Sequence, residues 1–110
     1  MEFGARGQEI QELVAALERG LGIEMREHDD SESGVSYHWS PDEFLAINIE
    51  PTRVIDPETG ELELGWKHWK RYDVVIGVSD ELEAHISRIR YLIQQGLLQA
   101  EELPPLPPLP

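Results

Sequence analysis

Side chains that can hold a metal ion or move a proton gather at two places in the sequence. Residues 27–30 read EHDD, a histidine among three carboxylates. Consecutive residues of an extended chain point in opposite directions, however, and the ligand spacings of zinc and calcium sites are missing. Glu81 and His85 are spaced to share one face of a helix, as an ordinary helix-surface pair does. The sequence therefore favours a solvated loop and a helix surface over a metal site.

No motif in the sequence indicates a particular enzymatic reaction. A glycine-rich phosphate loop, a nucleophile elbow and a paired-histidine zinc helix are all missing, and the absence of cysteine excludes thiolate chemistry. Asp42 beside Glu43, or Asp73 near His68, could exchange protons only inside a cleft, which the sequence does not indicate. We therefore predict no catalytic residue, no metal and no cofactor, and favour a binding protein over an enzyme.

The stretch with the strongest potential for contacts is WKHWKRY, at residues 66–72. It holds both lysines and two of the three tryptophans of a chain with 22 acidic and 9 basic residues. Trp, Tyr and Arg contribute most of the energy of protein–protein contacts. The sequence therefore predicts an aromatic and basic strip that binds a partner. Its residues are Trp66, Lys67, Trp69, Lys70 and Arg71, with Tyr37 and Trp39 as neighbours across the sheet.

A structural interpretation of this strip stays open. In a single strand Trp66 and Trp69 would point to opposite faces, so one could pack under a helix while the other lies against the stems of Lys67 and Arg71. A second candidate surface is the acidic outer face of the first helix, formed by Glu9, Glu12 and Glu18.

The net charge of −13 limits the classes of partner that the chain is expected to bind. Such a field repels nucleic acids and anionic membranes and attracts basic proteins, or it serves solubility alone. No apolar run approaches the roughly 20 residues of a membrane span, and no signal sequence is evident. We expect a cytoplasmic protein whose partner is another protein, with no nucleic acid and no membrane.

Hydrophobic periodicity predicts an α+β fold, a four- to five-stranded antiparallel meander flanked by an N-terminal and a C-terminal helix. The helical stripes are Ile10, Leu13, Val14, Leu17 and Leu21, and then Leu82, Ile86, Ile89 and Ile93. Strand alternation covers Val35, Tyr37 and Trp39, then Leu45, Ile47 and Ile49, while residues 53–64 form a hairpin and residues 74–78 a strand buried on both faces. Glycines 20 and 22 end the first helix, Ser79 caps the second, and residues 40–43 form a turn.

The ends of the chain lie outside this pattern. We expect a mobile lead-in at residues 1–7, a single domain at residues 8–99 and a polyproline-like tail at residues 100–110. Polyproline II has three residues per turn, so Leu103, Leu106 and Leu109 would lie on one edge of the tail. That edge could dock on its own domain, dock on a sister subunit of a homodimer, or bind a partner's aromatic groove, and a disordered end is the fourth alternative.

The order helix, antiparallel meander, helix is similar to that of frataxins and of the small acidic chaperones of type III secretion. The similarity covers architecture without a shared motif, so no residue role is carried over. The sequence predicts a small acidic protein-binding module: an inhibitor, an immunity protein, an adaptor or a dedicated chaperone. The alternative is a small-ligand or metal-binding protein, with or without catalytic activity, whose site lies between sheet and helices.

Overall fold

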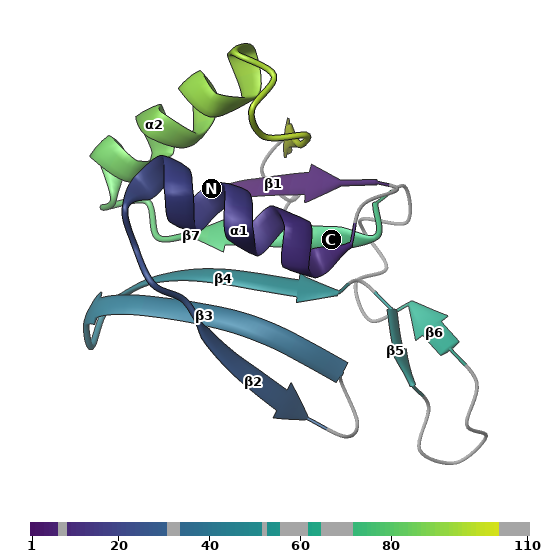
Figure 1. Ribbon diagram of the computed structural model, residues 1–110. Helices are drawn as coiled ribbons and strands as arrows, with labels where there is room; N and C mark the ends of the chain where they lie inside the picture. The colour runs from purple at the N-terminus through teal and green to yellow at the C-terminus, as the bar shows by residue number, and fades with distance from the viewer. Residues whose placement is uncertain (7–8, 31–33, 52, 56–61, 65–71, 104–110) are drawn as a thin grey trace, which may run out of the picture.

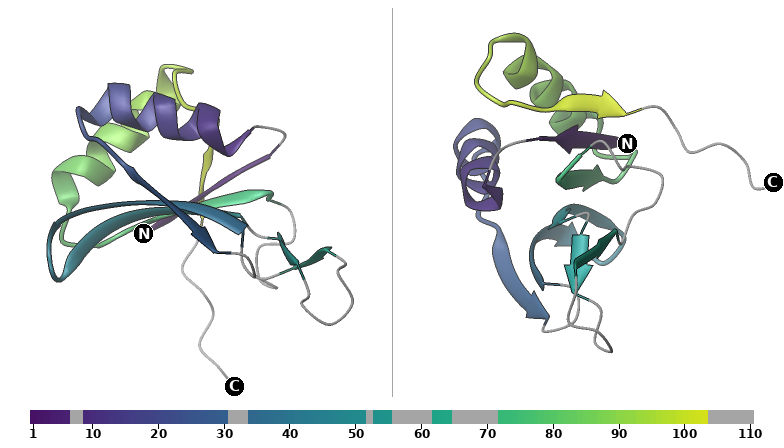
Figure 2. Two further views of the ribbon diagram at one scale, coloured as in Figure 1. Left: turned by 60° about the horizontal axis from the view of Figure 1, so that its bottom comes forward. Right: turned by 90° about the vertical axis from the view of Figure 1, so that its right-hand side faces the viewer.

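The computed structural model describes residues 1–6, 9–30, 34–51, 53–55, 62–64 and 72–103 (Figure 1). The fold is α+β, with a six-stranded antiparallel sheet in the order β2-β3-β4-β7-β1-β8 and a separate two-stranded sheet of β5 and β6. Both helices lie on one side of the large sheet (Figure 2). The elements are β1 (Glu2–Ala5), α1 (Ile10–Leu21), β2 (Arg26–Asp30), β3 (Gly34–Asp42), β4 (Leu45–Pro51), β5 (Arg53–Ile55), β6 (Leu62–Leu64), β7 (Val74–Val78), α2 (Glu83–Gln94) and β8 (Glu101–Leu103).

The N-terminal residues form an interior strand, so the prediction of a mobile lead-in is wrong. β1 lies between β7 and β8, and Phe3 pairs with Ile76 on one side and Glu102 on the other. The Phe3 side chain is 0% exposed. A four-residue strand is too short to show a period, so its place depends on partners far along the chain.

The first helix follows its apolar stripe. Leu13, Val14 and Leu17 are buried, and Gly22 ends the helix in the left-handed conformation, with φ 67°. Gly20 lies inside the helix instead of ending it. A Cβ atom there would come within 2.3 Å of the Leu92 side chain, so glycine lets α1 and α2 approach closely.

The central strands confirm the predicted alternation. Ile47 and Ile49 of β4 are buried, as are Ile76 and Val78 of β7. The turn between β3 and β4 follows Asp42, with an irregularity in the pairing between Trp39 and Asp42. β5 and β6 pair as the predicted hairpin. The sheet exceeds the expected four to five strands because β1 and β8 join it.

The second helix begins later than predicted. Leu82, Ile86, Ile89 and Leu92 are buried, but α2 starts at Glu83 without a side-chain cap. Ser79 fastens the preceding turn to β4 instead: its Oγ accepts a hydrogen bond from the Ala46 N–H (2.9 Å), and its own N–H donates to the Ala46 carbonyl (3.0 Å). Neither described helix is long and apolar enough to cross a membrane.

The start of the predicted polyproline tail is a strand. β8 pairs with β1, and Leu103 is 5% exposed beside Val75 and Tyr72. Strand pairing corrects the polyproline prediction for residues 101–103, and Leu103 contacts its own domain. Leu106 and Leu109 lie outside the described residues.

Candidate functional site

The two sides of the large sheet differ in what covers them. Ile47 and Ile49 point toward the helices, and their partners in β3, Trp39 and Tyr37, therefore point the same way. Both aromatic side chains are partly buried against the main core. Strand alternation therefore places them on the helix side of the sheet, and their position beside the aromatic and basic strip stays a prediction.

The predicted aromatic and basic strip lies outside the described residues. Trp66, Lys67, Trp69, Lys70 and Arg71 therefore stay a prediction, and the described chain resumes at Tyr72. On the side of the sheet away from the helices, Val75 and Leu103 are buried next to this tyrosine. The chain thus covers its own sheet at the β7–β1–β8 end.

The acidic face of α1 is only partly free. Glu9 and Glu12 are exposed at the start of the helix. Glu18 accepts a hydrogen bond from the Met25 N–H at 2.9 Å. This third carboxylate therefore holds the connection from α1 to β2, which narrows the predicted surface to Glu9 and Glu12.

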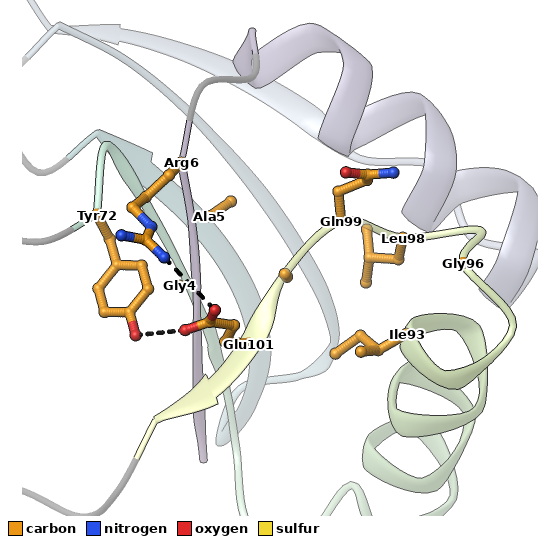
Figure 3. Close-up of a pocket in the computed structure, with 10 residues that line it drawn as sticks. Gly4, Ala5, Arg6, Tyr72, Ile93, Gly96, Leu98, Gln99 and Glu101 are labelled. Atoms are coloured by element: carbon orange, nitrogen blue, oxygen red, sulfur yellow. Dashed lines mark hydrogen bonds and ion pairs between the residues drawn. The ribbon is translucent and has the colours of Figure 1, made fainter.

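A hollow of about 370 Å³ opens where β8 diverges from β1 (Figure 3). Glu101 accepts a hydrogen bond from the Tyr72 hydroxyl (2.8 Å) and pairs with an Arg6 Nη atom (3.6 Å). The Arg6 guanidinium lies 5.7 Å from the Tyr72 ring centre. A Cβ atom on Gly4 would come within 2.6 Å of that ring, so glycine lets the tyrosine lie on β1. These groups satisfy one another, which indicates that they fasten β8.

A second ion pair connects β8 to α2. Arg90 Nη2 and Nε donate to the two carboxylate oxygens of Glu102, at 2.7 and 3.1 Å. The hydrogen bond from Arg90 holds the pKa of the Glu102 carboxyl below its ordinary value.

Replacing Glu102 by glutamine is expected to lower stability at neutral pH and to have little effect in acid. A carboxyl whose pKa is lower in the folded chain stabilises the fold above its unfolded pKa, and that contribution disappears as the pH falls through the folded pKa. The effect is small because both side chains are nearly half exposed. Urea unfolding from pH 7 to pH 3 measures it. A difference between wild type and variant that stays constant below the ordinary pKa of 4.5 would contradict the assignment.

The turn between β3 and β4 carries the most exposed aromatic ring of the described residues. The Phe44 side chain is 87% exposed. Its N–H donates to the Asp42 carboxylate (2.8 Å), and the Ser40 hydroxyl donates to the Leu45 carbonyl (2.7 Å). A turn held by its own side chains therefore presents the ring to solvent.

Exposed carboxylates surround this turn. Asp42 and Glu43 belong to it, and the Ser79–Ala46 hydrogen bonds bring the acidic start of α2 to the same end of the sheet (Figure 1). We call this region the hairpin end; it consists of Asp42, Glu43, Phe44, Asp80, Glu81 and Glu83. The Met1 ammonium group pairs with Asp80 at 2.8 Å and lowers the pKa of that carboxyl.

A further hollow, of about 470 Å³, lies where β2 and β3 diverge. β2 pairs with β3 only as far as Arg26 opposite His38, whereas β3 continues to Asp42. The hollow is lined by Glu24, Arg26, His38, Trp39 and Ser40. His38 Nδ1 contacts the Asn48 side-chain oxygen at 2.5 Å. The Trp39 ring centre lies 5.1 Å from that of His85 in α2.

His28 and the carboxylates next to it lie on strand β2. Residues 28–30, which were predicted to begin a loop, belong to this strand, so neighbouring side chains point to opposite faces. Among the described residues, no group of three or more histidine or acidic side chains could hold a metal ion.

Sequence patterns did not single out Phe44 as a candidate contact residue, because a strand was expected to begin directly after the turn at residues 40–43. A bulky apolar residue directly after an acidic turn was the available signal. Fold and site together define an acidic α+β protein with an ordered aromatic tip and an open polar hollow. No protein-family model, curated protein or solved structure matches the chain, so its function is argued from this geometry.

Proposed function

We propose that this chain is a protein-binding module that acts in the cytoplasm as an inhibitor, immunity protein, adaptor or dedicated chaperone. The observation that carries the proposal is Phe44, whose ring is 87% exposed on a turn held by hydrogen bonds. Without a partner, such a ring remains in water.

Burial of an aromatic ring favours association. Full burial of a phenylalanine side chain contributes about 1.5–3 kcal/mol. The Asp42 and Ser40 hydrogen bonds hold the turn in the free protein, which lowers the entropy lost on binding. Phe44 therefore suits the role of an anchor in a partner's apolar pocket.

The charge around the ring defines the partner's chemistry. Asp42, Glu43, Glu81 and Glu83 are exposed, and the whole chain carries a net charge of −13. Lysine and arginine side chains around the partner's pocket would complement this field and speed association. We therefore infer a basic protein as the partner, with binding that weakens as salt concentration rises.

Replacing Phe44 by alanine is expected to weaken partner binding by about tenfold or more. Leu97→Ala is the matched control, because Leu97 is also exposed (64%) but follows α2. Tagged wild-type protein and both variants are incubated with host extract. A partner captured by wild type and Leu97→Ala is then purified, and its affinity for each form is measured by calorimetry at low and high salt.

Equal affinity of wild type and Phe44→Ala would overturn the hairpin end as the contact surface. Trp66→Ala and Trp69→Ala in the same assay test the aromatic and basic strip separately. Loss of binding only in these two variants would assign the contact to the strip and would keep the protein-binding function.

Small-ligand binding is the alternative function, and one observation favours it. The hollow between β2 and β3, at about 470 Å³, falls within the range of ligand pockets.

A further inference from the structure

The outer face of α1 carries opposite charges at its two ends. With Leu13, Val14 and Leu17 buried, the helix turns Glu12, Ala15 and Arg19 to solvent, at the outside of the molecule (Figure 2). Seven residues of helix span about 10.5 Å, so Glu12 and Arg19 share this face without bridging each other. Among the described residues, neither has an oppositely charged partner. Both charges are therefore available to another molecule.

Neighbouring groups strengthen each end. Glu9 is exposed at the start of α1, next to the end that carries Glu12. At the other end, Arg88 of α2 donates from Nε to the Gly20 carbonyl at 3.1 Å, so a second guanidinium lies at the end that carries Arg19. Residues 84–100 contain no carboxylate side chain, in a chain with 22 acidic residues among 110. The surface along α1 is thus acidic at its N-terminal end and basic at its C-terminal end.

Small side chains lie between the charged ends. Ala15 is exposed, and Ala16 is partly buried beside it. Residues 12, 15, 16 and 19 follow the spacing of one helix face, along which a second helix can lie. Alanine at the centre permits an interaxial distance near the lower end of the usual 8–10 Å. In an antiparallel pair with a two-fold axis between Ala15 and Ala16, Glu12 and Arg19 are equally far from the axis, so each faces the other residue type across the contact.

We propose that α1 binds α1 of a second copy of this chain, antiparallel, about a two-fold axis between Ala15 and Ala16. Glu12 of each copy then pairs with Arg19 of the other, and the Glu9 end of each copy meets the Arg88 end of the other. The charge pattern favours this occupant, because a uniformly basic partner would face the arginines and a uniformly acidic one the glutamates. The same face on both copies makes the contact closed and isologous.

The contact is weak for two physical reasons. The 12 residues of α1 form only about 18 Å of helix, which is too short to bury the roughly 1,600 Å² of a standard stable interface. Two copies that each carry a net charge of −13 also repel one another. The dimer should therefore be reversible and form at a protein concentration of about 0.1–1 mM.

Charge exchange across the two-fold axis tests the proposal by sedimentation equilibrium. Glu12→Arg places arginine opposite arginine and Arg19→Glu places glutamate opposite glutamate, so each variant alone should be monomeric at about 1 mM, where wild type associates. An equimolar mixture of the two restores opposite charges at every pair and should dimerise. The double variant, which keeps the net charge of −13, should dimerise as wild type does.

Glu24→Arg and Arg26→Glu are the matched controls. Both residues are exposed outside α1, and their replacement changes the net charge by the same amounts. These controls should keep the wild-type association. Circular dichroism checks that every variant is folded, because reversed charges at the ends of α1 also oppose its helix dipole.

Three results would overturn the proposal. The first is a monomeric wild type at about 1 mM, and the second is a mixture of the two single variants that stays monomeric. The third is a loss of association in the controls equal to that in the α1 variants, which would assign the effect to net charge alone. Because Phe44 is not part of this face, none of these results bears on the proposed protein-binding function.

Discussion

Replacing Phe3 by alanine is expected to destabilise the protein by about 3–5 kcal/mol. The ring is 0% exposed, on a strand between β7 and β8. Its removal leaves a cavity in the core that the backbone of an interior strand cannot close. Domains of this size are stable by about 5–15 kcal/mol, so the loss is a large fraction of the total.

Urea unfolding followed by circular dichroism measures this loss. The chain contains two phenylalanines, and Phe44→Ala is the matched control. Because the Phe44 ring is 87% exposed, its removal should change stability by about 0.5 kcal/mol or less. If Phe3→Ala cost no more than this control, β1 would not belong to the folded core.

Leu103→Ala is expected to destabilise the protein by about 2–3 kcal/mol, at the lower end of buried leucine replacements. Leu103 is 5% exposed, but it packs in a small cluster with Val75 and Tyr72 instead of the main core. Among the described strands, β8 lies at the sheet edge and pairs with β1 alone, so we expect β8 to detach before the sheet unfolds. Hydrogen exchange should accelerate in β1 and in β8.

Leu97→Ala is the control for this prediction. Leu97 lies on the same connection but is 64% exposed, so its replacement should leave stability and exchange nearly unchanged. Equal exchange in wild type and Leu103→Ala would mean that the Arg90–Glu102 and Tyr72–Glu101 contacts alone hold β8.

The helices and central strands could be predicted from the sequence because their signals are local. The stripe from Leu13 to Leu17 and the alternation of Ile47 and Ile49 define buried faces within each segment. Gly22 marks the end of α1 through its own conformational freedom. These features need no knowledge of the rest of the chain.

The terminal strands could not be predicted in the same way. Glu2 pairs with Gly77 and Leu103, residues from the far half of the chain. Three or four residues have too few positions to show alternation, and a proline-rich continuation suggested a different conformation for β8. The role of Ser79 was predicted wrongly for a related reason. Its hydroxyl was expected to cap α2 but accepts a hydrogen bond from Ala46 of β4, a residue far away in the sequence.

For the candidate sites, too, some features follow from local sequence patterns and others depend on tertiary contacts. The sequence by itself determined the acidity of the chain, the stripes that build its core and the absence of a reaction motif. Only the tertiary structure decided that Phe3 is buried and Phe44 exposed, and that Trp39 packs against the core on the helix side of the sheet. Two identical side chains differ in this way because burial depends on contacts between segments far apart in the chain, whereas periodicity reports on each segment alone.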